Sequence, residues 1–191
     1  MNQWGFYFDQ TRCTGCYTCA VACKDWRDLP AGPVNWLRIK AIEEGDFPNV
    51  FVAYLAQACH HCQDPPCLKV CPVQAIAKRP EDGVVLVDQD KCLGNQDCPA
   101  SCLKACPWRA PQFGPEPGAK MQKCDLCLER LDQGRQPVCV EACPMYALEV
   151  GPLSELEARH GRNVEAAGFT YRAKIGPAVI FRPKPKPSGG N

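Results

Sequence analysis

The sequence lacks the features that mark membrane-spanning and nucleic-acid-binding chains. It has no uninterrupted run of about 18 to 20 apolar residues, which is the length that a membrane-spanning helix requires. Its best apolar stretch, Val50–Ala56, is only long enough for a strand. The 22 basic and 21 acidic residues leave a net charge of +1, so a field strong enough to attract nucleic acid is not expected. These absences predict neither a membrane span nor a nucleic-acid partner.

Signatures of catalysis and secretion are also missing. The chain contains no phosphate-binding loop, no dinucleotide-binding fingerprint and no nucleophile–base arrangement, so we predict no catalytic residues. The stretch Met1–Asp9 has no basic region, long apolar region or small-residue cleavage site of a secretory signal. This pattern favours a cytoplasmic location and reduced thiols.

Cysteine is abundant, at 16 of the 191 residues. In a short secreted chain this content would favour a disulfide scaffold. Here the cysteines come in tight groups, as metal ligands do. They form four runs of four with none left over: Cys13, Cys16, Cys19 and Cys23; Cys59, Cys62, Cys67 and Cys71; Cys92, Cys98, Cys102 and Cys106; and Cys124, Cys127, Cys139 and Cys143.

The second run shows the pattern most clearly, with three crowded cysteines followed by Cys71-Pro72. In two-cluster bacterial ferredoxins, three thiolates hold one cluster and the sulfur of a Cys-Pro reaches the neighbouring cluster. Thiolates are the soft ligands that iron–sulfur clusters need, and four complete one [4Fe–4S] cluster. Zinc ribbons also use Cys-x2-Cys, but they combine two separated pairs or add histidines, and only 3 histidines are present. The sequence predicts four [4Fe–4S] clusters, with a structural zinc protein as the alternative.

Two segments recur in a consistent order. Asp9-Gln-Thr-Arg-Cys13-Thr-Gly15 is repeated as Asp88-Gln-Asp-Lys-Cys92-Leu-Gly94, and Cys71-Pro-Val-Gln-Ala-Ile76 as Cys143-Pro-Met-Tyr-Ala-Leu148. Such self-similarity indicates an internal duplication of a two-cluster unit. We predict an α+β fold: a duplicated two-cluster bacterial ferredoxin-like fold with short strands, helices and long loops. It should form one domain of two intertwined halves, about residues 1–58 plus 114–182 and about residues 59–113, with a Pro-rich tail at 183–191.

The duplication also predicts how the ligands are shared, because the last sulfur of each run should cross to another cluster. In one half, Cys13, Cys16 and Cys19 should share a cluster with Cys143, and Cys124, Cys127 and Cys139 should share one with Cys23. In the other half, Cys59, Cys62 and Cys67 should share a cluster with Cys106, and Cys92, Cys98 and Cys102 should share one with Cys71.

Short elements are expected, since the chain has 19 prolines and 15 glycines. Alternation and composition favour strands at residues 6–9, 36–42, 50–56, 84–88 and 178–181. Helical segments are predicted at 20–28 and at 153–160, where Gly161 should end the helix. Cys124 and Cys127 are expected near a helix start, and the three-residue spacing before each Cys-Pro should begin a helix that carries the fourth sulfur.

Seven segments together resemble a known family: Gly5–Cys16, Ala22–Asp25, Cys59–Cys67, Lys69–Pro72, Ala105–Phe113, Lys123–Cys127 and Pro137–Pro144. The family is that of the four-cluster electron-transfer subunits of dimethyl sulfoxide reductase-type molybdenum or tungsten bis-pterin oxidoreductases, and the likeness covers about residues 5–182. It implies an electron relay between a larger molybdenum or tungsten catalytic subunit and a quinone-linked membrane anchor or soluble carrier. Some complexes of this family are exported folded, so export stays open. The alternatives are the corresponding subunit of a tungsten aldehyde oxidoreductase-type enzyme, or a free-standing polyferredoxin.

The third run departs from the family pattern. Five residues separate Cys92 from Cys98, and Asn95 stands where a cysteine is expected. Some family members with a non-cysteine residue in this run carry a three-iron cluster, but the four cysteines here favour four irons. The longer loop should make this cluster the easiest to lose.

Two further groups of side chains could act on the clusters. Arg12, Lys91 and Lys123 each precede the first cysteine of a run. A cation there would favour the more negative reduced cluster and raise its potential, or it could be a solvated loop side chain. His60 and His61 could couple protons to electron transfer, although hydrogen bonding within the loop or to a partner is the favoured interpretation.

Overall fold

The computed structural model describes residues 2–186 and combines short helices with three small sheets, consistent with an α+β fold. The last part of the predicted Pro-rich tail, residues 187–191, lies outside the described residues. Residues 183–186 have no regular secondary structure, and Lys186 Nζ lies 5.7 Å from the centre of the Phe51 ring.

The largest sheet has three strands in the order β6 (Leu148–Pro152), β1 (Trp4–Asp9) and β7 (Val179–Arg182). Strand β1 is antiparallel to β6 and parallel to β7. Gly5 lets β1 approach the segment before β7, because a Cβ there would lie 2.3 Å from the carbonyl oxygen of Ala178. The sheet thereby joins the two ends of the chain.

The two faces of this sheet follow the two-residue period of strands. Phe6 and Phe8 lie in the main apolar core with Phe181. Tyr7 points the other way and packs with Leu156 of helix α7 (Leu153–His160). Helix α7 therefore covers the face of the sheet that the core does not.

Two antiparallel strand pairs complete the sheets. Strands β2 (Arg38–Glu44) and β3 (Phe51–Gln57) form a long hairpin, and β4 (Ile76–Lys78) pairs with β5 (Val85–Val87). A smaller apolar core surrounds β4 and β5 and contains Ile76, Val85 and Met121.

The helices between the cysteines are short. They are α1 (Thr18–Trp26), α2 (Pro66–Lys69), α3 (Gly94–Asp97), α4 (Ser101–Ala105), α5 (Leu128–Leu131) and α6 (Val138–Glu141). Helices α1, α2, α4 and α6 each contain the third cysteine of their run. In the three runs that end in Cys-Pro the fourth cysteine follows the helix, so the prediction of a helix that carries the fourth sulfur is wrong. Cys23, which no proline follows, does lie within its helix, α1.

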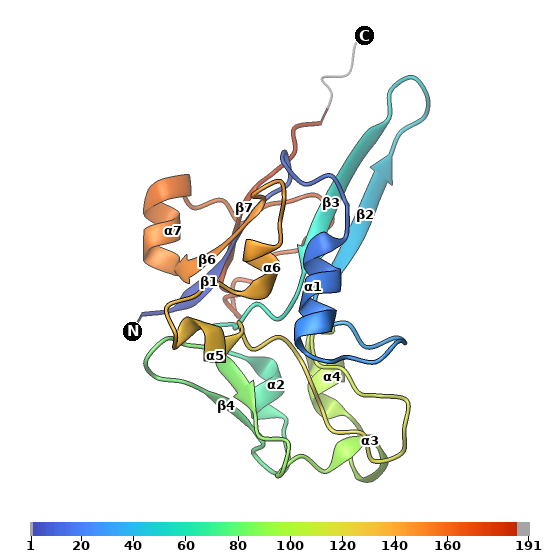
Figure 1. Ribbon diagram of the computed structural model, residues 1–191, viewed down its shortest axis with the longest axis vertical. Coiled ribbons are helices and arrows are strands. Elements are labelled where there is room, and N and C mark those ends of the chain that lie inside the picture. Colours follow the sequence, from blue (N-terminus) through green and yellow to red (C-terminus); the bar gives the residue numbers. More distant parts are fainter. Residues whose placement is uncertain (1, 187–191) are drawn as a thin grey trace.

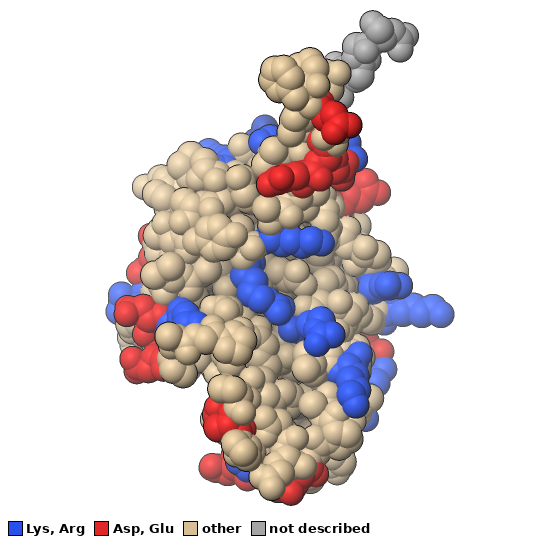
Figure 2. Space-filling view, turned by 90° about the vertical axis from the view of Figure 1, so that its right-hand side faces the viewer, with Lys and Arg blue, Asp and Glu red and all other residues tan. Residues whose placement is uncertain are grey.

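The chain ends and the chain middle occupy different parts of the molecule (Figure 1). The sheet, α1, α6 and α7 lie in the upper part, and α2, β4, α3 and α4 lie in the lower part. The β2–β3 hairpin projects from the upper part, and Phe47 near its tip is 92% exposed. Figure 2 shows lysine and arginine side chains gathered across the middle of one face, with acidic side chains towards the projecting end.

The strands and the two longer helices predicted from the sequence are present, with boundaries shifted by up to two residues. The prediction missed strands β4 and β6, and it missed β6 because Gly151 and Pro152 are typical of the start of a helix. Cys127 does lie at a helix start, as the N-cap of α5. Within the described residues, no helix has the length and apolar content needed to cross a membrane.

Candidate iron–sulfur centres

The three Cys-Pro segments fold into the same turn. The third residue after each cysteine has a positive φ: 51° at Gln74, 50° at Arg109 and 50° at Tyr146. The fourth is an alanine whose N–H donates to the cysteine Sγ: Ala75 to Cys71 at 3.2 Å, Ala110 to Cys106 at 3.4 Å and Ala147 to Cys143 at 3.3 Å. A donor aimed at sulfur favours the thiolate over the thiol. The three turns therefore hold their cysteine sulfurs in the same geometry.

The segments that lead into the first and third runs each form a backbone hydrogen bond to the Cys-Pro turn of another run. The Asp9 N–H donates to the Ala147 carbonyl at 2.9 Å, and the Asp88 N–H donates to the Ala75 carbonyl at 2.8 Å. The adjoining strands pair in the same way, β1 with β6 and β5 with β4. Run one consequently lies beside the end of run four, and run three beside the end of run two.

One pocket, which we name the Cys13 pocket, is lined by Cys13, Cys16, Cys19 and Cys143. Its walls are mainly apolar and include Phe8, Ile39 and Leu148. Burial, followed by the nearby Cys143 and Cys13 sulfurs, raises the pKa of Cys19 to about 12. Thiolates held close together oppose one another's ionisation, and a cation among them offsets that repulsion.

A second pocket, the Cys92 pocket, is lined by Cys71, Cys92, Cys98 and Cys102. Cys98 has an extended backbone immediately after α3. Burial raises the pKa of Cys102 to about 11, with the neighbouring cysteine sulfurs adding to the effect. Asn95 does not line this pocket. Its Nδ2 donates to the carbonyls of Gly114 at 3.2 Å and Glu116 at 3.1 Å.

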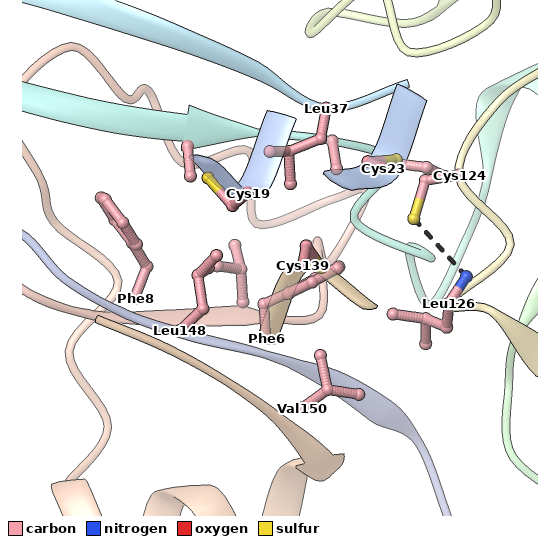
Figure 3. Close-up of a cluster of buried hydrophobic side chains, with 14 of the residues drawn as sticks. Phe6, Phe8, Cys19, Cys23, Leu37, Cys124, Leu126, Cys139, Leu148 and Val150 are labelled. Atoms are coloured by element: carbon pink, nitrogen blue, oxygen red, sulfur yellow. Dashed lines mark hydrogen bonds between the residues drawn. The ribbon is translucent and has the colours of Figure 1, made fainter. Parts of the chain in front are cut away.

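A third group of cysteines is buried in the main core, where α1 packs against α6. Figure 3 shows Cys23 and Cys124 side by side, with the Leu126 N–H donating to Cys124 Sγ at 3.5 Å. Burial raises the pKa of Cys139 well above its usual value, and the charges of Cys23 and Cys127 add to this effect. Cys23, Cys124, Cys127 and Cys139 therefore form one buried neighbourhood.

A fourth group lies where α2 packs against α4. Burial raises the pKa of the Cys62 thiol, and the next contributions come from Cys59, Cys106 and Cys67. These four cysteines are close enough to oppose one another's ionisation, as ligands gathered around one centre would.

The donor set and its surroundings fit [4Fe–4S] clusters. All 16 cysteines are free thiols among the described residues, and thiolates are the ligands that such clusters use. In the absence of iron, burial keeps most of these thiols protonated, so cluster assembly must displace protons. No three Cys, His, Asp or Glu side chains within residues 2–186 converge on a single-ion site. A four-iron cluster does not require that convergence, because each thiolate binds a different iron.

The two central histidines are buried within the fold. Burial lowers the pKa of His60 to about 3 and that of His61 well below its usual value. His61 Nδ1 accepts the Val85 N–H at 2.9 Å, while His60 packs edge-on against Trp108 with 5.2 Å between ring centres. Both imidazoles are therefore neutral near pH 7, and His61 fixes the loop of run two to β5.

Sequence reasoning missed some cations that reach the cysteine loops. Lys78 Nζ donates to the Cys62 carbonyl at 2.6 Å, and Arg38 Nη2 donates to the Trp108 and Arg109 carbonyls at 3.0 Å. Neither residue is adjacent to a cysteine, so the sequence carried no signal for them. The alanine four residues after each Cys-Pro cysteine did carry a signal, since it occurs in all three segments.

Comparison with known proteins defines the class first. Two models of the 4Fe-4S dicluster domain match the chain, one at residues 50–153 and one at residues 12–75. The chain is a 4Fe-4S dicluster protein, and two dicluster domains with 16 cysteines correspond to four [4Fe–4S] clusters.

Individual relatives then narrow the class. The chain is 44% identical to the probable anaerobic dimethyl sulfoxide reductase chain YnfG of Escherichia coli strain K12, over 95% of this chain and 89% of that protein. It is 42% identical to the B subunit of the anaerobic dimethyl sulfoxide reductase of the same strain, with the same coverage. It is also 34% identical to the thiosulfate reductase electron transfer subunit PhsB of Salmonella typhi, over 96% of this chain and 93% of that protein. The chain belongs to the family of iron–sulfur electron-transfer subunits of dimethyl sulfoxide reductase-type oxidoreductases.

Proposed function

We propose that this chain relays electrons through four [4Fe–4S] clusters between a molybdenum or tungsten bis-pterin catalytic subunit and a quinone-linked membrane anchor or soluble carrier. The relatives support the catalytic partner, because their names place them in reductase complexes. When bound, the clusters supply the electron transfer itself, and the chain's part is to hold and insulate them.

The ligand sets we propose follow the four neighbourhoods. They are Cys13, Cys16, Cys19 and Cys143; Cys23, Cys124, Cys127 and Cys139; Cys59, Cys62, Cys67 and Cys106; and Cys71, Cys92, Cys98 and Cys102. The observation that carries this assignment is the pair of hydrogen bonds from Asp9 to Ala147 and from Asp88 to Ala75, at 2.9 and 2.8 Å. The first bond brings the start of run one to the Cys-Pro of run four, and the second brings the start of run three to the Cys-Pro of run two. The same pairing supports the two intertwined halves.

We propose that the clusters lie in that order along the molecule. Cys139 is close enough for the charges of both Cys23 and Cys19 to raise its pKa, which supports contact between the first two sites. Cys124 is affected in the same way by Cys59, which supports contact between the second and third. Only three residues separate Cys102 from Cys106, which joins the third site to the fourth. We place the chain in the cytoplasm, or at a membrane through its partner, with export of a folded complex as the other outcome.

The first test is metal content. Anaerobically purified protein should contain about sixteen irons and sixteen acid-labile sulfides per chain, because four thiolates complete each four-iron cluster. Stoichiometric zinc with little iron would overturn the proposal. A structure of the loaded protein in which each consecutive run holds its own cluster would overturn the crossed ligand sets.

The second test is partnership. The untagged native protein should purify with a larger subunit that contains molybdenum or tungsten. A fully loaded chain that emerges alone and reduces soluble acceptors at physiological rates would instead be a free-standing polyferredoxin.

A further inference from the structure

Lys123 is a buried cation. It is 2% exposed, and its Nζ donates to the carbonyl oxygens of Val85 and of Cys124, the latter at 3.0 Å. These bonds fix its ammonium group between strand β5 and the fourth cysteine run.

No carboxylate among residues 2–186 forms an ion pair with Lys123. The nearest acid along the chain, Asp125, is bonded to Arg27 Nη2 at 2.7 Å. Two neutral carbonyl oxygens accept hydrogen bonds from the Lys123 ammonium group, but they do not neutralise its charge. A buried ammonium ion in such surroundings needs a nearby negative charge.

The groups around Lys123 are ligands of the two inner sites. It precedes Cys124, and its Nζ donates to the Val85 carbonyl oxygen. The Val85 N–H in turn donates to His61 Nδ1 at 2.9 Å, and His61 adjoins Cys62. The ammonium is thus near both the Cys23/Cys124/Cys127/Cys139 set and the Cys59/Cys62/Cys67/Cys106 set.

The chain contains two matched residues that occupy the same sequence position in other runs. Arg12 precedes Cys13 and Lys91 precedes Cys92, but their side chains are 58% and 65% exposed. Arg12 lies 4.0 Å from Asp9, and Lys91 lies 3.1 Å from Asp88. Water and these carboxylates screen both charges, whereas Lys123 is buried from water and the acid nearest to it along the chain, Asp125, is paired with Arg27.

We propose that the Lys123 ammonium is the counter-charge shared by the two inner clusters and that it raises their midpoint potentials. This inference rests on the ligand sets proposed above. A [4Fe–4S] cluster gains one negative charge when it accepts one electron, and a buried cation favours the more negative state. The two clusters nearest Lys123 become easier to reduce, while the outer two depend little on the cations beside them.

The test compares Lys123→Met with Arg12→Met and Lys91→Met in the full chain, purified anaerobically with its native complex. Potentiometric titration followed by electron spin resonance gives the midpoint potentials, with one electron from the mediators reducing each cluster. In Lys123→Met, two of the four midpoints should become at least tenfold harder to reduce, which is 59 mV for one electron. The two control variants should move each midpoint by less than this.

Full iron content with unchanged midpoints in Lys123→Met, or shifts no larger than in the controls, would overturn the inference. If Lys123→Met loses iron, Lys123→Arg decides the matter. If Lys123→Arg recovers the iron and the midpoint potentials of the unsubstituted protein, the positive charge is what the site needs. If it does not recover them, Lys123 acts through packing, and the inference is overturned. The iron content of the unsubstituted protein tests the proposed function separately, before any variant is made.

Discussion

The Cys13 pocket and the Cys92 pocket are built alike although their ligand spacings differ. Their open volumes are about 320 and 360 Å³. Each is closed on one side by a Cys-Pro turn from another run, and the alanine of that turn, Ala147 or Ala75, lines the pocket. Leu148 of β6 lines the Cys13 pocket, and the corresponding residue of β4, Ile76, lines the Cys92 pocket.

The difference lies in the second cysteine of each run. Cys16 follows Cys13 after two residues, whereas Cys98 follows Cys92 after five. The three extra residues form part of α3, and Asn95 bonds to the 114–116 loop instead of facing the pocket. The Cys-Pro turn from another run and the adjoining pair of strands shape each pocket. The spacing between the cysteines can therefore vary, provided that a cysteine still lines the pocket.

The largest effect should come from removing that cysteine. Cys98→Ser is expected to lose one iron from the Cys92 site and to give a three-iron electron spin resonance signal, because three thiolates remain. Iron analysis and spectroscopy of the anaerobic protein provide the measurement. Full retention of sixteen irons would show that Cys98 is not a ligand.

A second substitution sharpens the same comparison. Asn95→Cys in the Cys98→Ser background restores the family's usual spacing between the first and second cysteines, but we expect no recovery of the lost iron. Asn95 is fixed by its own N–H to the Ala119 carbonyl at 3.0 Å and by its side chain to the 114–116 loop. Recovery of four irons would mean that sequence spacing, rather than the packed loop, selects the ligand.

The glycine two residues after the first cysteine should matter more in the Cys92 pocket. Gly15 and Gly94 both have positive φ, +70° and +86°. An alanine at either position should cost about 1–3 kcal/mol in backbone strain. A Cβ at Gly94 would lie 2.4 Å from the Gly118 carbonyl oxygen, whereas one at Gly15 would meet the movable Tyr54 ring. Gly94→Ala should therefore lower the temperature of cluster bleaching more than Gly15→Ala, and the reverse order would contradict this account.

The sequence predicted the parts of this fold that repeat. The four cysteine runs, the matching approaches at Asp9 and Asp88, and the alternating residues of β1 could all be recognised from the sequence. Strand β6 could not, because Gly151 and Pro152 resemble a helix start and only pairing with β1 makes the segment a strand. Distance in sequence also hid the cations, since Lys78 reaches the Cys62 carbonyl across 16 positions. Local patterns identify candidate ligands, whereas tertiary contacts determine their electrostatic surroundings.

A moderate effect is expected from oxidation. The Cys92 site should lose iron before the Cys13 site, because a longer loop must stay ordered around its metal. Stepwise exposure to ferricyanide, followed by spectroscopy, should give a three-iron signal first. In Cys98→Ser protein, which already gives this three-iron signal, the first oxidation step should add no further signal, and that result would assign the signal to the Cys92 site. Equal loss from all four sites would contradict the expected difference.

The smallest difference between the two pockets should appear in their response to pH. Burial raises the pKa of Cys19 to about 12 and that of Cys102 to about 11. Both values lie far above pH 8, so both thiols are protonated in the iron-free chain and each releases one proton when it binds iron. Lower pH should therefore speed iron loss to a chelator from both pockets by a similar factor between pH 8 and pH 6.

In the iron-free chain lower pH has the opposite effect and stabilises the fold. The raised pKa values stabilise the folded state below the unfolded thiol pKa of about 8.5, and this contribution is lost as pH rises towards 11 and 12. Chelator-driven iron release at pH 6, 7 and 8 measures the first effect, and release that is faster at pH 8, or that depends on pH in only one pocket, would show that proton linkage does not follow burial here.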